Sequence, residues 1–505
     1  MSYLKSEYKL GYGSYSFFKT MLMTTTKTSL NFPKQFPLYL ANRPVTSNQW
    51  LDVTDKFTHQ IFTQVALADA EIIEQAIAAA VKAEKPMAQL KTYQKQAILQ
   101  HCVKRFTERF DELVEVLILE GGKSLTSAKG EVLRLISTFQ LASDAVTQLD
   151  KGSVMPLDVT QTAGAYRGMT QRVPVGAVSL ISPFNFPLNL TAHKIAPAIA
   201  AGCPFVLKPA SLTPVSALIM AEVLAETDLP IGAFSILPCH REGADLFVTD
   251  DRFKLLSFTG SDQVGWDMKA RAGRKKVVLE LGGNAAVIVE PDTDIDAALD
   301  RLITGSFIQS GQVCISVQRI LAHQAIYDEL KAKFVARASQ LKPADPHLAD
   351  TVIGPMIKEK EAQRLKGWID DAANQGATVL AGGHLVGSML EATVLENVSD
   401  SSDVYQNEAF GPVVILEKYA TFDEAIDLVN QSRFGLQAGV YTQNLAKMLK
   451  AWDELHVGGV IINDVPTFRV DNMPYGGVKD SGLGREGIRY AIADMCEERV
   501  LVIKQ

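Results

Sequence analysis

The fold is decided by the stretch AVSLISPFNFPLNLTAHKIAPAIAAGCPFVLK, residues 177–208. Its first five residues, Ala177–Ile181, are mostly apolar and predict a buried strand. Leu188–Ala201 follows Pro187 and predicts a helix, and Pro204–Leu207 predicts a second short strand. A strand, a helix and a strand at this spacing favour a parallel pair of strands, because parallel strands need a long crossover connection.

The same alternation continues toward the C-terminus. Pro214–Thr227 predicts a helix with a proline at its start, and further strands are predicted at Phe234–Leu237, Leu255–Phe258 and Val277–Leu279. This pattern indicates a parallel sheet of the dinucleotide-binding kind. On the N-terminal side, residues 70–150 are rich in helix-forming residues, and residues 151–172 change to short extended pieces.

The second half of the chain predicts another α/β domain with different content. Its predicted strands are Val287–Val289, Ile320–Ala322 and Val413–Leu416. Its predicted helices are Asp294–Ile308, Ile326–Gln340, Lys358–Gln375 and Phe422–Ser432. The last stretch, Glu498–Ile503, predicts a terminal strand that needs a partner. The fold class is therefore α/β.

Bulk composition narrows the function. A chain of 505 residues suggests two or three domains, and 47% apolar with 21% charged residues is ordinary for a globular enzyme. A net charge of −7 argues against a nucleic-acid partner. The longest apolar run, Ile195–Leu207, is shorter than the ~18 residues that a membrane span needs. No membrane partner is therefore expected.

The five cysteines are scattered and form no C-x-x-C pair: Cys102, Cys203, Cys239, Cys314 and Cys496. This pattern fits neither a disulfide framework nor a zinc site, so no metal is expected and a reducing, cytoplasmic location is predicted. The first twenty residues lack the apolar core of a signal peptide, and Met21 or Met23 is an alternative start.

Four segments combine Gly, Pro and polar residues between apolar strands: S-P-F-N-F-P at Ser182–Pro187, L-E-L-G-G-N at Leu279–Asn284, G-Q-V-C at Gly311–Cys314 and N-E-A-F-G-P at Asn407–Pro412. Together they resemble the aldehyde dehydrogenase superfamily. The likeness extends through Lys208–Ala210, Phe258–Ser261 and Met473–Gly487, and it covers the chain from about Ile61 onward. The resemblance implies oxidation of a small aldehyde to a carboxylic acid with NAD or NADP.

The resemblance assigns three catalytic residues. Cys314 matches the nucleophile, which attacks an aldehyde as a thiolate. Asn185 matches the donor that stabilises the resulting oxyanion, together with the backbone N–H of Cys314. Glu280 matches the general base that activates water to hydrolyse the thioester. Relatives that release the acyl group to coenzyme A typically lack this glutamate, so release to water is predicted.

The resemblance also implies a cofactor site. Lys208 ends a strand at the edge where open α/β sheets bind ligands, and Gly260, Ser261 and Gly265 lie at a helix start that suits a phosphate. Glu408 is expected to bind the nicotinamide ribose, and Phe410 to pack beside the nicotinamide. The remaining expected cofactor residues are Ser182, Pro183, Phe184, Ser211 and Leu281.

Two positions depart from the family pattern. Many NAD-preferring relatives carry a glutamate where this chain has Ser211, three residues after Lys208. The serine removes the repulsion of a 2′-phosphate, so NADP is expected to be tolerated. Phe184 stands where many relatives have tryptophan, and since it remains aromatic little change is expected.

The substrate is less determined. P-T-F-R-V-D at Pro466–Asp471 resembles branches that include lactaldehyde and phosphonoacetaldehyde dehydrogenases. Arg469 is a candidate anchor for a substrate carboxylate, phosphonate or hydroxyl, and a structural pair with Asp471 or another acid is the alternative. Arg134 is a second candidate anchor, although a position on a solvated helix face is favoured for it. Val313 precedes the nucleophile where an arginine would favour a glyceraldehyde-3-phosphate enzyme.

The resemblance implies three parts. Residues 1–148 and 173–282 are expected to form a Rossmann-like cofactor domain, residues 283–486 a catalytic domain, and residues 149–172 with 487–505 a small oligomerisation element of β structure. A homodimer or homotetramer is expected. Two alternatives stay open: a semialdehyde dehydrogenase that transfers its acyl group to coenzyme A, and a catalytically silent scaffold with this fold.

Overall fold

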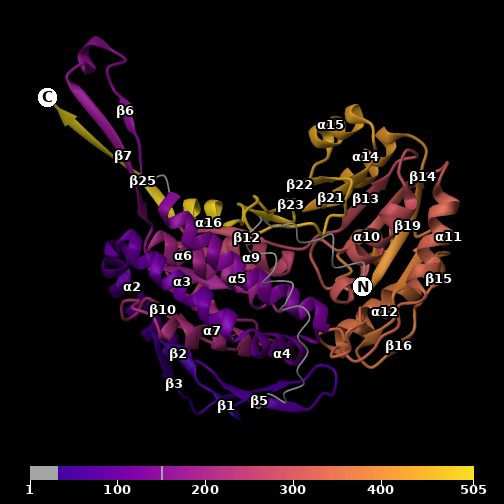
Figure 1. Cartoon of the computed structure of the whole chain (residues 1–505), viewed down its shortest axis with the longest axis horizontal. Coiled ribbons are helices and arrows are strands. Elements are labelled where there is room, and N and C mark those ends of the chain that lie inside the picture. Colours follow the sequence, from indigo (N-terminus) through magenta and orange to yellow (C-terminus); the bar gives the residue numbers. More distant parts are fainter. Residues whose placement is uncertain (1–31, 149–151, 241) are drawn as a thin grey trace. The chain divides into compact units, whose positions relative to one another are not determined.

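Most of the predicted cofactor residues lie at or just after the strand ends of an eight-stranded sheet. In the computed structural model (Figure 1), which describes residues 32–148, 152–240 and 242–505, the strands of this sheet follow the order β24-β12-β11-β8-β9-β10-β2-β3. They are β2 (Leu38–Leu40), β3 (Arg43–Val45), β8 (Val178–Ile181), β9 (Phe205–Lys208), β10 (Phe234–Ile236), β11 (Leu255–Thr259), β12 (Lys276–Glu280) and β24 (Gly482–Leu483). The five strands from β12 to β10 are parallel, as the sequence predicts.

Helices cover both faces of this sheet. The helices before and within this part of the chain are α2 (Ala70–Gln89), α3 (Thr92–Glu108), α4 (Phe110–Gly121), α5 (Leu125–Gln148), α6 (Asn189–Ala201), α7 (Val215–Ala225), α8 (Asp245–Thr249) and α9 (Asp262–Arg271). α2, α8 and α9 share one apolar core with the strands. α6 and α7 also contact strands, and α3, α4 and α5 pack over them. All of α6 is buried because it lies between these layers.

A seven-stranded sheet forms the centre of the second α/β part, in the order β15-β18-β19-β14-β13-β21-β22. Its strands are β13 (Ala285–Val289), β14 (Val317–His323), β15 (Thr378–Ala381), β18 (Thr393–Glu396), β19 (Val413–Tyr419), β21 (Gln437–Tyr441) and β22 (Gly459–Ile462). Its helices are α10 (Ile295–Phe307), α11 (Tyr327–Ala338), α12 (Glu359–Asn374), α13 (Asp403–Gln406), α14 (Phe422–Asn430) and α15 (Leu445–Glu454). A further helix, α16 (Ile488–Asp494), packs on α5 and α6 of the first part.

Alternation along β13 shows how this sheet is covered on both faces. Val287 and Val289 belong to the core that α10 and α11 cover, while Ala286 and Ile288 belong to the core that α14 and α15 cover. Successive side chains of a strand point to opposite faces, so a strand that is apolar throughout requires helices on both sides.

The predicted terminal strand has its partner within the chain. β25 (Cys496–Lys504) pairs antiparallel with β7 (Tyr166–Pro174), which also pairs with β6 (Val154–Pro156) (Figure 1). Smaller pairings involve β1 (Gln35–Phe36), β4 (Trp50–Thr54), β5 (Ile61–Ala66), β16 (Leu385–Val386), β17 (Met389–Leu390), β20 (Phe434–Gly435) and β23 (Val478–Lys479). The sequence did not predict these smaller strands, because runs of two to six residues carry little periodic signal.

Residues Lys34–Gln505 form one compact unit. The proposed start at Met21 or Met23 lies outside the described residues, as do residues 149–151 of the predicted oligomerisation element. No helix within residues 32–148, 152–240 and 242–505 combines the length and the hydropathy that spanning a bilayer requires.

The pairing of β24 with β12 joins the C-terminal segment to the predicted base. Glu280 is the last residue of β12, and its Cα partner across the pair is Gly482. The backbone N–H of Leu281 also donates to the carbonyl of Ser481 at 3.0 Å. A short strand of two residues therefore holds Glu280 beside residues that lie some two hundred positions later.

Gly482→Ala is expected to weaken this pairing. Gly482 has φ of 151°, and a Cβ there would lie 2.2 Å from the carbonyl oxygen of Leu279. Strain of this kind costs about 1–3 kcal/mol of unfolding free energy, which urea unfolding would measure. Gly367→Ala is the matched control, because a Cβ at Gly367 in α12 meets nothing within 4 Å. Equal stability of the two variants would contradict the importance of this pairing.

Candidate active site

Cys314 lies in a small apolar cluster. Val313, Ile315, Leu436 and Tyr475 form its buried part, and Phe186, Ile308 and Cys314 pack against them. The Sγ atom of Cys314 lies 3.0 Å from the hydroxyl oxygen of Tyr475. Cys314 keeps some exposed area, but its surroundings exclude most water, and this burial raises the pKa of the thiol to about 12.

The loop that leads to Cys314 has an unusual backbone. The residues of Gln309–Gly311 have φ values of 52°, 55° and 70°. Left-handed conformations cost energy for residues other than glycine, so the surroundings must hold them. The Gln309 side chain does this, since it accepts a hydrogen bond from Lys123 Nζ at 2.5 Å and donates one to the carbonyl of Asn185 at 2.5 Å. The loop and Asn185 are thereby tied together.

Asn185 lies beside this loop, as an oxyanion donor should. It is 4% exposed, and its Nδ2 donates to the carbonyl of Gln312 at 3.0 Å. A side-chain amide carries two N–H donors, and this hydrogen bond uses one of them. The backbone carbonyl of Gln312 therefore orients the Asn185 amide, which is predicted to donate to the oxyanion.

Glu280 is buried, and neither of its carboxylate oxygens has a hydrogen-bond partner among the described residues. Burial raises the pKa of Glu280 well above its ordinary value, and the negative charge of Glu486 adds to this. Lys194 and Arg469 act in the opposite direction. A buried carboxyl group with unused oxygens and a raised pKa is suited to exchange a proton with water near neutral pH.

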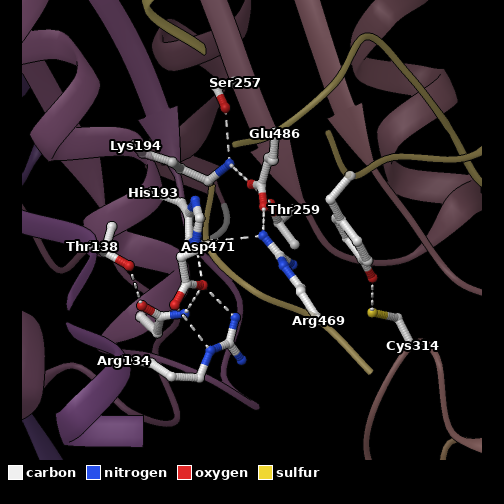
Figure 2. A network of polar contacts seen from close by, with 12 residues as sticks. Arg134, Thr138, His193, Lys194, Ser257, Thr259, Cys314, Arg469, Asp471 and Glu486 are labelled. Atoms are coloured by element: carbon white, nitrogen blue, oxygen red, sulfur yellow. Dashed lines mark hydrogen bonds and ion pairs between the residues drawn. The ribbon is translucent and has the colours of Figure 1, made fainter. Parts of the chain in front are cut away.

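Glu486 is the counter-ion of two buried cations. Figure 2 shows Lys194 and Arg469 reaching it from two sides, with Nζ of Lys194 at 3.6 Å from Oε1 and Nη2 of Arg469 at 3.0 Å from Oε2. Burial opposes ionisation of Glu486, but Lys194 and Arg469 outweigh it and lower its pKa to about 2. The pKa of Glu280 is thus raised while that of Glu486 is lowered.

The expectation that Arg134 lies on a solvated helix face is wrong. Only 24% of its side chain is exposed, and Nη2 lies 2.6 Å from Oδ1 of Asp471 (Figure 2). Asp471 is buried and also contacts Nε2 of His193 at 2.8 Å. The Arg134 guanidinium lies 5.9 Å from the centre of the Phe186 ring. This face of α5 meets the C-terminal segment, which is why solvent does not reach it fully.

Arg469 also lies against the apolar cluster. Its guanidinium stands 3.7 Å from the centre of the Tyr475 ring, and its acid partner is Glu486 rather than Asp471. Only 7% of the side chain is exposed, and Nε is buried without a hydrogen-bond partner among the described residues. Arg469 therefore combines a structural ion pair with an unused donor.

The strand ends of the eight-stranded sheet offer groups that fit a dinucleotide. Lys208 ends β9, and its half-buried amine donates only to the carbonyl of Pro209, at 3.4 Å. Burial lowers the pKa of Lys208. The hydroxyl of the exposed Ser211 makes one long contact, to the carbonyl of Cys239 at 3.4 Å. Both groups can turn toward ribose or phosphate oxygens. Ser182 and Pro183 follow β8 at the same edge.

The N-terminus of α9 fits a phosphate. Ser261 is the N-cap residue, but its side chain makes no capping hydrogen bond, so backbone N–H groups of the first turn stay available. A Cβ on Gly265 would lie 2.4 Å from Leu281, and one on Gly260 would lie 2.4 Å from the Phe258 ring. Glycine at these positions lets the helix start lie close to the strand ends.

Glu408 and Phe410 face the glycines that follow Glu280. Glu408 accepts a hydrogen bond from the backbone N–H of Gly283 at 3.0 Å, and burial raises its pKa to about 7. Phe410 has φ of 47° and packs edge-on against Phe184, with ring centres 5.7 Å apart. The two predicted cofactor aromatics therefore contact each other.

Sequence reasoning missed the groups that surround the predicted catalytic residues: Lys123, His193, Lys194, Gln309, Tyr475 and Glu486. Tyr475 and Glu486 lie inside Met473–Gly487, which was noted only for its likeness to the family. Lys194 carries a usable signal, because an ionisable residue in an otherwise apolar helix needs a buried partner. The identity of that partner was not visible in the sequence.

The family profile described as "Aldehyde dehydrogenase family" matches residues 43–501. The chain belongs to the aldehyde dehydrogenase family. This aldehyde dehydrogenase oxidises an aldehyde to a carboxylic acid with NAD or NADP. The predicted family, fold class, reaction and cofactor class are thereby confirmed.

Three relatives illustrate the breadth of the likeness. The chain is 39% identical to the 3-sulfolactaldehyde dehydrogenase of Priestia aryabhattai, over 94% of this chain and 99% of that protein. It is 48% identical in sequence to aldehyde dehydrogenase 21 from Physcomitrella patens, whose crystal structure was solved in complex with the reaction product succinate. The two structures match with a TM-score of 0.92 over 94% of this chain and 99% of that chain. This chain is 36% identical to glyceraldehyde-3-phosphate dehydrogenase GapN from Methanocaldococcus jannaschii complexed with NADP, with a TM-score of 0.87 over 91% and 100%.

Proposed function

We propose that this aldehyde dehydrogenase oxidises a short aldehyde that carries a second, anionic group, and that it releases the product acid to water. The observation that carries this proposal is the position of two guanidinium groups beside the apolar cluster at Cys314. Arg134 lies near Phe186, and Arg469 stacks on Tyr475. The cluster suits a short carbon chain, and the arginines suit a carboxylate, sulfonate or phosphonate.

In the first step the thiolate of Cys314 attacks the aldehyde carbon. A C–S bond forms while the π electrons of the carbonyl move to its oxygen, which becomes an oxyanion. The amide of Asn185 and the backbone N–H of Cys314 donate hydrogen bonds to this oxygen. The hydrogen bonds of Gln309 and Gln312 to Asn185 hold its amide in advance, so little reorganisation of this donor is needed when the charge develops.

The oxyanion then returns its electrons, and the C–H bond breaks with its electron pair, which leaves a thioester on Cys314. When bound, the nicotinamide ring accepts that hydride. Glu280 next takes a proton from water, and the resulting hydroxide attacks the thioester carbon. The C–S bond breaks, and its electrons return to the Cys314 sulfur as thiolate. The carboxylic acid loses its proton to solvent.

Glu280 must pass on the proton that it takes from water. Glu486 lies close enough to raise the pKa of Glu280, and it carries Lys194 and Arg469 as counter-ions. Because Glu486 stays ionised, its negative charge favours the protonated form of Glu280. The two cations beside Glu486, Lys194 and Arg469, are donors that can rearrange around that proton. We propose that this network lets Glu280 alternate between its two protonation states.

The substrate class rests on the arginines and on two relatives. One relative was crystallised with succinate, and another is a 3-sulfolactaldehyde dehydrogenase, so both act on or bind molecules with an acidic group. The unused Nε of Arg469 and the partly exposed guanidinium of Arg134 provide donors for such a group. A four-carbon semialdehyde with a terminal carboxylate is the first candidate substrate.

We further propose that the eight-stranded sheet with its helices is the cofactor domain, that the seven-stranded sheet with its helices carries catalysis, and that β6, β7 and β25 form the oligomerisation element. β25 is an edge strand, and Val500–Ile503 are exposed on it. An edge with exposed apolar residues favours pairing with a second copy. Sedimentation equilibrium would compare the particle mass with the chain mass of 55.1 kDa.

We propose the cytoplasm as the compartment of this enzyme. The argument is chemical: the proposed nucleophile is a free thiol, and the other four cysteines are free as well. A reducing compartment keeps such thiols from oxidation. Fractionation of cells that express the chain would test this, and enrichment in a secreted fraction would contradict it.

Glu280→Gln is expected to stop the reaction at the thioester. The amide keeps the shape of the side chain but takes no proton. One NAD(P)H per active site should therefore form in a fast first phase, and the steady turnover that follows should be about 10²–10⁴-fold slower than in the wild type. Absorbance at 340 nm after rapid mixing measures both phases. In the wild type, thioester hydrolysis should speed up as pH rises, because the pKa of Glu280 is raised and the carboxylate form grows with pH.

Cys314→Ala is the control for that experiment, since it should show neither burst nor turnover. Coenzyme A is the second control. If the wild type forms an acyl-coenzyme A product at a higher rate than free acid, the alternative of acyl transfer replaces hydrolysis. Steady turnover of Glu280→Gln at the wild-type rate would place the base elsewhere.

The substrate proposal predicts a clear preference for anionic aldehydes. Charged hydrogen bonds contribute about 1.5–3 kcal/mol, so kcat/KM for succinic semialdehyde or sulfolactaldehyde should exceed that for butanal by about ten- to a hundredfold. Lactaldehyde, which has a hydroxyl but no charge, should fall between them. Arg134→Gln should lower kcat/KM for the anionic substrates and leave butanal almost unchanged.

Arg337→Gln is the matched control for Arg134→Gln, because Arg337 pairs with Asp300 on the exposed surface. It should leave all substrates unaffected. Equal kcat/KM values for butanal and succinic semialdehyde in the wild type would refute the anionic substrate class, while the assignment of Cys314 would stand.

Ser211→Glu is expected to reduce the use of NADP far more than that of NAD. The carboxylate would repel a 2′-phosphate. If this repulsion costs about 1.4 kcal/mol or more of binding free energy, the KM for NADP should rise about tenfold or more. Initial rates with each cofactor measure this. Ser211→Ala separates the added charge from the lost hydroxyl, and it should affect both cofactors little. A parallel rise in both KM values would mean that Ser211 does not face the 2′ position.

A further inference from the structure

Tyr475 makes one hydrogen bond with its side chain, and the partner is the sulfur of Cys314. The ring is buried, with 3% of the residue exposed, and its hydroxyl oxygen lies 3.0 Å from Sγ. No other partner of this hydroxyl exists in the described part of the chain. A buried phenol normally satisfies its O–H. Here the group that satisfies it is the predicted nucleophile itself.

The Tyr475 ring is held firmly in this position. The backbone of Tyr475 exchanges two hydrogen bonds with Glu486, at 3.0 and 2.6 Å. The guanidinium of Arg469 covers one face of the ring at 3.7 Å from its centre, and Arg469 is itself tied to Glu486. The backbone pairing and the stacked guanidinium therefore hold the Tyr475 ring beside Cys314.

The charges around Cys314 make this hydrogen bond useful. Burial and the nearby carboxyl groups of Glu408 and Glu280 all raise the pKa of Cys314. The hydrogen bond from Tyr475 is the largest influence that lowers it, and the charge of Arg469 is the second. A thiolate in this pocket therefore depends on a neutral donor and one cation to offset two acids and the loss of water.

We propose that Tyr475 is a catalytic residue whose hydroxyl donates a hydrogen bond to the Cys314 thiolate and stabilises it before it attacks the aldehyde. This inference rests on the proposed role of Cys314 as nucleophile. In the neutral thiol either group can act as donor, but after the thiol proton leaves to solvent only the phenol carries a hydrogen to donate. The cation above the ring strengthens it as a donor, because positive charge makes a phenol more acidic.

The hydrogen bond affects the thiol in two opposing ways. Each unit by which it lowers the pKa of Cys314 raises the thiolate fraction about tenfold at a pH below the pKa, while the intrinsic nucleophilicity falls only about threefold. The net gain is about threefold for each unit. Stabilising the thiolate therefore speeds attack below the pKa, and it slows attack at a pH where the thiol is fully ionised.

Tyr475→Phe tests the proposal, since it removes one oxygen atom and leaves the ring under Arg469. The rate at which iodoacetamide alkylates Cys314 would be followed by peptide mass spectrometry between pH 6 and 9, with Cys314→Ala as background. We expect the pKa of Cys314 to rise by about one to two units, which lowers the thiolate fraction at every pH below the pKa. Alkylation at pH 8 should therefore slow by about three- to tenfold.

The matched control is Tyr327→Phe. Tyr327 is a buried tyrosine whose hydroxyl donates to Glu396 at 2.7 Å, and it packs in the core under α11 instead of in the apolar cluster at Cys314. Its variant should lose a comparable hydrogen bond and leave the alkylation profile of Cys314 unchanged. If Tyr475→Phe also leaves the alkylation rates of Cys314 unchanged, the hydroxyl does not stabilise the thiolate and the proposal is overturned.

A second measurement does not depend on removing the hydroxyl. Site-specific incorporation of 3-fluorotyrosine at position 475 makes the phenol a stronger donor, so alkylation of Cys314 at pH 8 should speed up, opposite to the change for Tyr475→Phe. An unchanged alkylation rate would overturn the proposal. Failure of the nucleophile assignment looks different: Cys314→Ala would then retain dehydrogenase turnover, whatever the profiles of the Tyr475 variants.

Discussion

The two-residue pairing of β24 with β12 is the contact on which the site depends. It sets Gly482 opposite Glu280, in the same C-terminal segment in which Tyr475 pairs with Glu486. Without it the proposed nucleophile Cys314 and its loop would remain in the seven-stranded part, while the proposed base Glu280 would remain at a strand end of the eight-stranded sheet. Catalysis by thioester needs both around one carbon atom.

This convergence creates an electrostatic difficulty that the structure meets with buried pairs. Glu280, Glu408 and Glu486 all lie near Cys314 or near each other, and a buried carboxylate without a partner is costly. Lys194 and Arg469 hold Glu486 ionised, so that Glu280 becomes the group with a raised pKa. Cys314 is affected by the same acids, and the donor that opposes them directly is the Tyr475 hydroxyl. The same charged residues therefore influence the pKa of both the proposed base, Glu280, and the proposed nucleophile, Cys314.

The same residues connect chemistry with substrate choice. Arg469 neutralises Glu486, covers the Tyr475 ring and retains an unused donor, so the group that would bind a substrate anion also touches the partner of the nucleophile. An anion that binds Arg469 would draw positive charge away from the phenol and from Cys314. Arg134 is linked to Arg469 only indirectly, because its acid partner Asp471 contacts His193, whose Nε2 lies 3.4 Å from Nη2 of Arg469. The two arginines are therefore unequal, although both lie at the same apolar cluster.

The sequence by itself determined the α/β class, the parallel order of the strands around Ala177–Leu207 and the positions of Cys314, Asn185 and Glu280 within short segments. These features are local: strands and helices follow from the spacing of apolar residues, and the segments are read directly. Tertiary structure alone decided which charges meet. Arg134 was assigned to a solvated face because helical spacing describes one helix and not what packs on it. The contacts of Tyr475, Lys194 and Glu486 form only when the chain returns across β12. Contacts between residues so far apart depend on tertiary packing, which no local sequence pattern encodes.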